Sequence, residues 1–508
     1  AAATGLAAPA IVRAQTPFRD YPFSLGVASG DPASDGFVIW TKLAPEPLAP
    51  RGGMPRDTML VSWEVASDSG FTKDVIKGEV LARPELNHAV HVEVGGLLPD
   101  RPYFYRFTAG GERSLRGTAR TLPMAGAAVD RVRFGICGCQ HFEDGFFGAY
   151  RHLAREELNF VYHYGDFIYE YGLDYTFPGG LPAAPVRRSG IRGLMDITDF
   201  RFAYAQQLSD VDLQAARSRH PFLASYDDHE VRNNWVADND DWSRDPNDPR
   251  EPVSPELFRL RKQAAMQAWY EHMPVRRALL PRDGRVGLHR ELKLGGLLSL
   301  QLLDTRLYRS NQPCGDGFKP HCAGVDDAAQ TVLGAEQEAW LARNMAGGQI
   351  WNALAQQITM MSLDRRRRAE EPAKIMNMDS WAGYETARQR MLTRFAGRRN
   401  NVVLTGDEHQ NFCGDLVQRD RIVASEFVTT SISSGGNGSD RRAGTDEWMK
   451  YNPQLKFAND QRGYSVCEVT PDAWQTHYMV MDQVTVREPT ASRRMTATVA
   501  RDKAGITL

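Results

Sequence analysis

The sequence lacks an excess of charge of either sign, and it lacks long hydrophobic runs. Its 508 residues include 61 lysines and arginines against 63 aspartates and glutamates, a formal net charge of −2. This balance excludes binding to nucleic acid or membrane surfaces driven by overall charge. No apolar run approaches the roughly 18 residues that cross a bilayer. We therefore expect no stable membrane insertion.

Cysteine is scarce, and its spacing argues against a structural zinc site. The six cysteines form no pair of C-x-x-C motifs. Cys314 and Cys322 enclose a short loop, in P-C-G-D-G-F-K-P-H-C, whose glycines and prolines allow the two side chains to meet. We predict a disulfide between them if the protein matures in an oxidising compartment.

The first 15 residues, A-A-A-T-G-L-A-A-P-A-I-V-R-A-Q, are small or apolar and include no acid. The V-R-A segment has the pattern that signal peptidase accepts. We interpret residues 1–15 as the remnant of an export signal and expect a periplasmic or secreted protein whose precursor uses an export machinery. A twin-arginine signal and an ordinary alanine-rich extension both stay open as alternatives.

Residues 18–123 contain short β-rich runs separated by turns, among them 36–40, 59–65, 88–94 and 102–107. This spacing predicts a small antiparallel β-sandwich. The segment L-P-D-R-P-Y-F-Y-R-F is similar to the end of a fibronectin type III-like domain. No cluster of His, Cys or Asp accompanies these runs, so we expect the function to lie elsewhere. Residues 124–130 form the predicted linker.

From residue 131 to residue 508, apolar strands alternate with long helical stretches, which is typical of a layered α/β domain. One helix is predicted to start after Ser254, with Pro255 in its first turn, and to end before Pro274. The face expected to pack against the sheet carries Leu257, Leu260, Ala264, Ala268 and Trp269.

Polar residues follow directly after six of the predicted strands. These residues are Cys139 and Gln140, Asp166 and Tyr169, Asp227–Glu230, Asp304–Arg306, Gln356 and Gln357, and Asp407–His409. The carboxyl ends of strands are where α/β sheets place their active-site crevice. The sequence therefore predicts one site assembled from six segments.

The residue types select the chemistry of this site. A thiolate, a phenolate, an imidazole and several carboxylates need cations to neutralise them. A phenolate with a thiolate favours Fe³⁺, whereas Asp166, Asp228, Asp407 and a side-chain amide suit Ca²⁺. Two ions roughly 3.5 to 4 Å apart can hold a bridging hydroxide and clamp a phosphoryl group for in-line displacement. This arrangement predicts phosphoester hydrolysis.

The motifs G-D-F-I-Y, D-D-H-E and G-D-E-H, in this order and after strands, resemble the calcineurin-like (purple acid phosphatase-type) metallophosphoesterases, in the variant of the alkaline phosphatase D (PhoD-like) family. The segments V-A-S-G-D-P, C-G-C-Q, L-D-T-R-L-Y-R-S and E-F-V-T-T-S-I-S-S-G-G extend the match over nearly the whole chain. The resemblance implies a four-layer α/β/β/α sandwich over residues 131–508, preceded by the all-β region.

The resemblance also implies the roles of individual residues. The implied ligands of the first metal, iron, are Cys139, Asp166, Tyr169 and His409. The implied ligands of the second metal are the bridging Asp166, Asp228, Asp407 and Gln356 or Gln357. This second ion is expected to be Ca²⁺, with Zn²⁺ or another divalent ion as the alternative. His229 is expected to stabilise the transition state or to protonate the leaving oxygen.

Four further residues are predicted to contact the substrate: Arg232, Asn234, Arg306 and Trp381. Arg232 stands where the family pattern leads us to expect an acidic residue. Arg306 has an alternative role, which is a structural ion pair with Asp304.

We therefore predict an exported hydrolase that acts on small phosphoesters, both monoesters and diesters, at alkaline pH. Nucleic acid is expected only as a potential substrate. One alternative is a phospholipase D-like phosphodiesterase. An alternative of a different class is a β-sandwich adhesion or carbohydrate-binding protein with a vestigial hydrolase domain, against which the intact Asp166, Asp228, Asp407 and His409 argue.

Overall fold

The computed structural model describes residues 18–171, 185–191, 193–239, 254–366, 368, 370–371 and 374–508. Residues 1–15, interpreted as an export-signal remnant, lie outside this part of the chain. Within it, no helix combines the length and the hydrophobicity that a membrane span requires.

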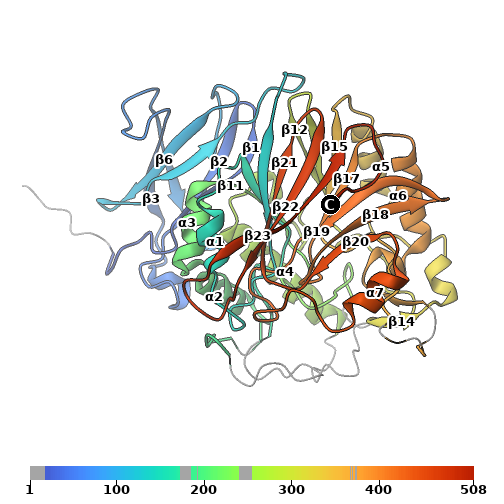
Figure 1. Ribbon diagram of the computed structural model, residues 1–508. Helices are drawn as coiled ribbons and strands as arrows, with labels where there is room; N and C mark the ends of the chain where they lie inside the picture. The colour runs from blue at the N-terminus through green and yellow to red at the C-terminus, as the bar shows by residue number, and fades with distance from the viewer. Residues whose placement is uncertain are drawn as a thin grey trace, which may run out of the picture.

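Two large sheets form the centre of the molecule (Figure 1). The first has nine strands in the order β23 (Ala491–Ala500), β22 (Ala473–Met481), β21 (Gly463–Val469), β9 (Val132–Cys137), β10 (Phe160–His163), β11 (Pro221–Ala224), β1 (Val27–Ala33), β2 (Gly36–Lys42) and β5 (Ala89–Val94). The second has seven strands in the order β12 (Arg290–Leu294), β13 (Leu298–Leu302), β15 (Trp351–Ala355), β17 (Asn401–Thr405), β19 (Arg421–Val428), β18 (Asn411–Gln418) and β20 (Leu455–Asn459).

The two sheets pack face to face through a shared apolar core. Phe134 and Tyr162 of the first sheet belong to the same buried cluster as Leu300, Ala353 and Val402 of the second. The strands that contribute most of this core are parallel, β9 to β10 to β11 in one sheet and β13 to β15 to β17 in the other. Parallel strands need a cover on their outer faces as well.

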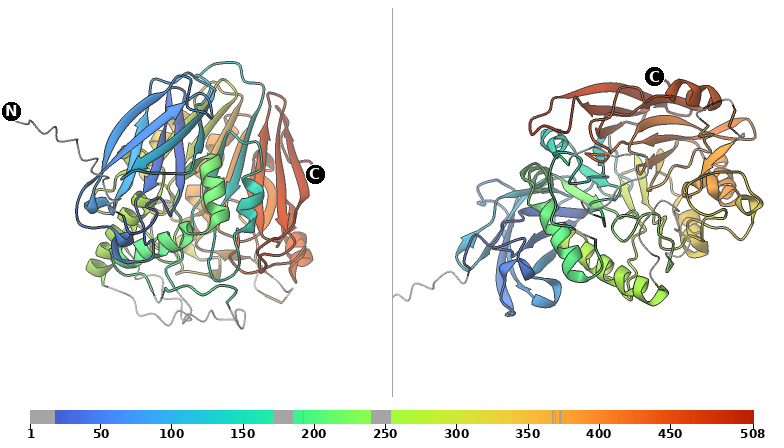
Figure 2. Two further views of the ribbon diagram at one scale, coloured as in Figure 1. Left: turned by 90° about the vertical axis from the view of Figure 1, so that its left-hand side faces the viewer. Right: turned by 90° about the horizontal axis from the view of Figure 1, so that it is seen from below.

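Helices supply that cover. The helices of the first outer layer are α1 (Gly148–Leu153), α2 (Ile197–Leu208), α3 (Val211–Arg219) and α4 (Pro255–His272). Those of the second are α5 (Gly334–Asn344), α6 (Glu385–Ala396) and α7 (Thr445–Tyr451). Figure 2 shows both sets on opposite sides of the molecule. The predicted order of layers, helix, sheet, sheet and helix, is confirmed.

The N-terminal region is an all-β sandwich, as predicted, but it shares a sheet with the rest of the protein. Its second sheet contains β3 (Met59–Ala66), β4 (Ile76–Ala82), β6 (Pro102–Ala109), β7 (Glu112–Arg113) and β8 (Gly117–Arg120). On β2, Phe37 and Ile39 face the core of this sandwich, whereas Trp40 packs into the cluster that includes the α-helices. Strand β1 pairs in parallel with β11. The domain boundary between residues 123 and 131 stays a prediction.

Helix α4 has the predicted start, and its predicted buried face is right near its end but wrong in its first turns. The Ser254 hydroxyl caps it by accepting from the Leu257 amide at 3.3 Å. Leu257 and Leu260, expected to face the sheet, are 53% and 61% exposed. Ala268 and Trp269, expected on the same face, are buried, and so is Phe258. The two aromatic side chains bury more apolar area than the leucines, and they set the rotation of the helix.

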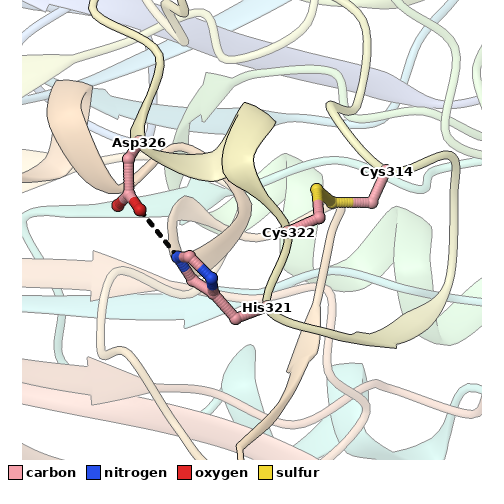
Figure 3. The surroundings of a disulfide bond; sticks show 4 residues. All are labelled: Cys314, His321, Cys322 and Asp326. Atoms are coloured by element: carbon pink, nitrogen blue, oxygen red, sulfur yellow. Dashed lines mark ion pairs between the residues drawn. A yellow bond between two sulfur atoms is a disulfide. The ribbon is translucent and has the colours of Figure 1, made fainter.

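A small ribbon of β14 (Phe318–Pro320) and β16 (Ile375–Asn377) lies beside the second sheet. Cys314 and Cys322 are joined by a disulfide at its base, with their Cα atoms 6.4 Å apart (Figure 3). In the same loop, His321 pairs with Asp326 at 2.8 Å. The other cysteines, Cys137, Cys139, Cys413 and Cys467, are buried and free.

Candidate metal centre

Most of the predicted metal ligands come from loops that follow three strands of the first sheet and one strand of the second. Cys139 follows β9, Asp166 and Tyr169 follow β10, and Asp228 follows β11. Because β9, β10 and β11 are parallel neighbours, their carboxyl ends lie at one edge of the first sheet. His409 follows β17 of the second sheet and completes a group with Cys139 and Asp166. The site therefore lies where the two sheets meet.

The backbone at this site is strained. Cys139, Asp166, Asp407 and His409 all have left-handed conformations, with φ of 50°, 55°, 66° and 54°. Residues other than glycine rarely adopt this conformation, and strain of this kind concentrates at functional sites. The conformation turns each side chain sharply after its strand, so the three loops that carry these residues converge on one point.

The glycines of the C-G-C-Q and G-D-E-H motifs make room for this convergence. A Cβ atom on Gly138 or on Gly406 would lie 2.3 Å from the ring of Tyr164. The Tyr164 ring is thus clamped between the two loops, and its hydroxyl donates to the Thr430 carbonyl at 2.9 Å. A side chain at either glycine would separate the loop that carries Cys139 from the loop that carries Asp407.

Sulfur, phenol and imidazole form the first half of the site. The Cys139 thiol donates to Asp166 Oδ2 at 3.1 Å, and the Tyr169 hydroxyl lies 3.3 Å from the same oxygen. His409 Nε2 is 3.2 Å from that hydroxyl, which also accepts from Ser434 at 2.7 Å. We call these four predicted residues, Cys139, Asp166, Tyr169 and His409, the thiolate half.

Burial dominates the electrostatics of the thiolate half. It raises the pKa of the Cys139 thiol and of the Tyr169 phenol well above their usual values, and nearby Asp166 raises both further. Burial also lowers the pKa of His409 to about 3. A neutral imidazole is ready to ligate a metal, whereas the thiol and the phenol need a cation to lose their protons.

Carboxylates form the second half of the site. Asp227, Asp228 and Asp407 each offer an oxygen, and these oxygens lie within 4.8 Å of one another. Asp166 and Asp228 are grouped in the same way with His229. We call Asp227, Asp228 and Asp407 the carboxylate half. Asp166 belongs to the thiolate half, yet it also offers an oxygen within 4.8 Å of Asp228, which is the geometry expected of a bridging ligand.

Arg306 is a cationic partner shared by all three residues of the carboxylate half. Its Nε donates to Asp227 Oδ1 at 2.6 Å, and its Nη2 lies 3.7 Å from Asp228 Oδ1 and 3.9 Å from Asp407 Oδ1. Its Nη1 donates to Asp379 Oδ2 at 2.7 Å. Asp304 instead accepts from the backbone amide of Arg306 at 2.9 Å. The predicted pairing of the two side chains is replaced by this network.

Several carboxylates of the site keep raised pKa values despite Arg306. Burial raises the pKa of Asp166 and of Asp407 well above the usual range, and that of Asp227 to about 7 despite Arg306. Asp228 Oδ1 and Asp227 Oδ2 are buried with no hydrogen-bond partner in the part of the chain that the structure describes. Buried polar atoms without partners are rare in proteins, and a bound cation supplies the missing partner. The donor set therefore fits two cations.

His229 lies against both halves. Its Nδ1 is 2.7 Å from Glu170 Oε2, and its backbone amide donates to Asp166 Oδ1 at 3.4 Å. Burial lowers the pKa of His229, but the carboxylates of Asp228 and Glu170 outweigh burial and raise it to about 8. Glu170 therefore fixes the orientation of the imidazole, and it was missed although it directly follows the G-D-F-I-Y motif.

Glu230 was also missed as a functional residue. Its carboxylate accepts from the backbone amides of Asp166 at 3.1 Å, Phe167 at 2.7 Å and Asp227 at 2.8 Å. This one side chain ties the loop after β10 to the loop after β11. The sequence signal that could have identified Glu230 is its position as the last residue of the D-D-H-E motif.

Gln357 and Trp381 lie in hydrogen-bond networks away from open space. The Gln357 amide accepts from the Thr305 hydroxyl at 2.6 Å and donates to the Ser225 hydroxyl at 2.7 Å. Trp381 is buried and donates to Gln356 at 3.1 Å. The ligand role of Gln357 and the substrate contact of Trp381 stay predictions that this packing does not favour.

The remaining predicted substrate contacts differ in their surroundings. Asn234 is half-buried; its backbone amide donates to Asp228 Oδ2 at 2.7 Å, and its side chain donates to Asp316 at 2.9 Å. Arg232 is buried on the same turn. A cavity of about 930 Å³ opens beside Asn234 and Asp407. Asn234 therefore lies at the border between the site and this cavity.

Comparison with known proteins identifies the family of this chain. The PhoD-like phosphatase model matches residues 134–478, and the model of the PhoD-like phosphatase N-terminal domain matches residues 7–123. The chain belongs to the PhoD-like phosphatase family. Alkaline phosphatase D of Bacillus subtilis (strain 168) is 42% identical over 504 residues, which cover 97% of this chain and 84% of that protein.

A solved structure shows the same fold. The structure described as "Structure of PhoD" superposes with a TM-score of 0.90 at 42% identity, and the match covers 96% of this chain and 92% of that chain. The expected family, the four-layer fold with an all-β N-terminal region and the phosphoesterase class are confirmed. The chain is a PhoD-like phosphoesterase with candidate metal-binding clusters.

Proposed function

We propose that this PhoD-like phosphatase is an exported Fe³⁺ and Ca²⁺ enzyme that hydrolyses phosphomonoesters and phosphodiesters at alkaline pH. The observation that carries the proposal is the shared position of Asp166 between two donor sets of different chemistry. Cys139, Tyr169 and His409 supply soft and phenolic donors, whereas the other half supplies carboxylate oxygens alone.

The residues of the site would act as metal ligands, as a proton donor and as a counter-ion. Cys139, Tyr169, His409 and Asp166 would hold iron; Asp166, Asp228 and Asp407 would hold calcium. When bound, two cations activate a water nucleophile and neutralise the charge of the phosphoryl oxygens. His229, held by Glu170, would bring a proton to the oxygen of the leaving alcohol. Arg306 would keep the carboxylates in place.

The deciding experiment measures metals and activity together. Protein purified without chelator should contain iron and calcium, and it should hydrolyse a phosphomonoester and a phosphodiester with a maximum above pH 7. Activity that persists after both metals have been removed would overturn the two-metal site. A protein that carries zinc in place of calcium would correct the second metal while it leaves the donor arrangement intact.

Export is supported by the disulfide between Cys314 and Cys322, since such bonds persist in oxidising compartments. N-terminal sequencing of the protein recovered from its native cell should find a start near Gln15 and a periplasmic or secreted location. An intact Ala1 on cytosolic protein would contradict this proposal.

A further inference from the structure

The cavity beside the site is far larger than the phosphoryl group that the site would hold. The cavity has a volume of about 930 Å³. Pockets that bind whole organic ligands have volumes of roughly 300 to 1,000 Å³. Asp407 and Asn234 line one end of it, and Phe318 with Ile375 and Asn377 lines another. The organic part of a phosphoester can therefore lie against this second wall.

The β14 and β16 ribbon builds that wall with two distinct faces. Phe318 pairs directly with Asn377, and residues opposite each other in an antiparallel pair share a face. Ile375 lies two residues from Asn377 and so shares that face as well. Met376 points the other way, into a small buried cluster with Val325, against which the disulfide packs. One face is anchored, and the other lines the cavity.

Phe318 is 58% exposed in this position. A single exposed apolar side chain on an open surface is ordinary. Here, however, the ring lines the cavity of the metal centre, and the disulfide and the buried rear face of the ribbon hold its backbone in place. An aromatic side chain has few rotatable bonds, so it loses little conformational freedom when another ring packs on it.

The loop that carries Phe318 also contacts the site directly. Asp316, two residues earlier, accepts from the Asn234 side chain at 2.9 Å, and the Asn234 amide donates to Asp228. The position of the Phe318 ring is thus tied to the position of the carboxylate half through a short chain of hydrogen bonds. This link sets a defined spacing between a phosphoryl group and a ring beside it.

We infer that Phe318 determines specificity, because its ring packs against an aromatic ring carried by the organic group of the phosphoester. The inference rests on the proposed function and names its substrate class, which is phosphoesters of aryl or nucleobase-bearing groups. Ring pairs add a modest and orientation-dependent stabilisation, so the effect belongs to discrimination between substrates and not to the chemical step.

Calorimetric binding of two phosphonates to the metal-loaded protein tests this inference. Phenylphosphonate and methylphosphonate share the anionic group, and neither carries an ester bond to be cleaved. The wild-type protein should prefer phenylphosphonate. Phe318→Ala should weaken the binding of phenylphosphonate by roughly 2- to 10-fold, the range of one ring pair, and leave methylphosphonate unchanged. Phe318→Trp should keep the preference.

Leu260→Ala is the matched control, because Leu260 is similarly exposed, at 61%, on α4 and does not line the cavity. It should change neither affinity. Equal losses for both phosphonates in Phe318→Ala, or no loss for either, would overturn the inference. Because binding is measured without turnover, absent phosphoesterase activity in the wild-type protein would count against the proposed function alone.

Discussion

The two halves of the candidate metal centre neutralise their charge differently. The carboxylate half has a cation of its own, since Arg306 donates to Asp227 and lies within 3.9 Å of Asp407. The thiolate half keeps its groups protonated by burial, which raises the pKa of Cys139 and of Tyr169. Only a bound cation can make these two groups anionic ligands.

This difference indicates what metal binding should change at each half. The carboxylate half can stay folded with Arg306 as its counter-ion, although buried oxygens of Asp227 and Asp228 lack partners. The thiolate half is stable without metal as a set of neutral hydrogen-bonded groups. Metal at the thiolate half should therefore change its spectrum and chemistry, whereas metal at the carboxylate half should change stability.

Replacing Asp166, which joins the two halves, should have the largest effect. Asp166→Asn removes the negative charge that both cations share, so metal should be lost from both positions and turnover should fall by several orders of magnitude. Metal content and turnover measure this. Asp283→Asn is the control, because Asp283 has a similar φ of 51° but is exposed far along the chain. Native turnover with both metals in Asp166→Asn would show that Asp166 does not bridge.

His229→Ala should lower turnover while the metals stay. Loss of a general acid reduces the rate by roughly 10² to 10⁴-fold. Glu170→Gln should have a smaller effect in the same direction, since it weakens the contact at 2.7 Å that orients the imidazole. The measurement is turnover of a phosphomonoester together with metal content. Loss of metal in His229→Ala would instead make this residue a ligand.

Arg306→Gln tests the counter-ion of the carboxylate half. Removing one member of a buried ion pair leaves charges without a partner and should lower the free energy of unfolding by about 3 to 5 kcal/mol. Arg120→Gln is the control, since Arg120 pairs with Asp100 at 2.6 Å near the surface and should change it by about 1 kcal/mol or less. Chemical denaturation measures both. If Arg306→Gln leaves the free energy of unfolding unchanged, the metals alone neutralise the carboxylates.

Chelation should destabilise the protein more at high pH than at low pH. Asp227, Asp166 and Asp407 have raised pKa values in the fold, about 7 for Asp227, against roughly 3.9 in the unfolded chain. The metal-free fold therefore loses stability as the pH rises above about 4, until it has passed the folded pKa values. Bound cations remove this loss. Thermal unfolding with and without chelator at pH 5 and pH 8 should show the larger difference at pH 8; equal differences would contradict the argument.

The sequence predicted the fold and the assembly of the site, because strand periodicity and the polar residues after each strand are local signals. Cys139, Asp166 and His409 were placed together by that rule alone. The buried face of α4 was right at Trp269 but wrong at Leu257 and Leu260, since it depends on which side chains bury the most area after packing. Glu170 and Glu230 were missed because their partners are a neighbouring imidazole and backbone amides that meet only in the folded protein.

The smallest expected effect concerns colour. If Tyr169 and Cys139 bind Fe³⁺, charge donation from the phenolate and the thiolate to the oxidised metal should colour the protein. Tyr169→Phe should shift or bleach that absorption band while Cys139, Asp166 and His409 retain the iron. Tyr171→Phe is the control, because its ring packs 5.6 Å from that of Tyr169 yet is no predicted ligand. The Tyr169 hydroxyl already accepts from Ser434, so Ser434→Ala should shift the band less than Tyr169→Phe does. An active enzyme that is colourless and free of iron would remove iron from the thiolate half and leave its four residues to another cation.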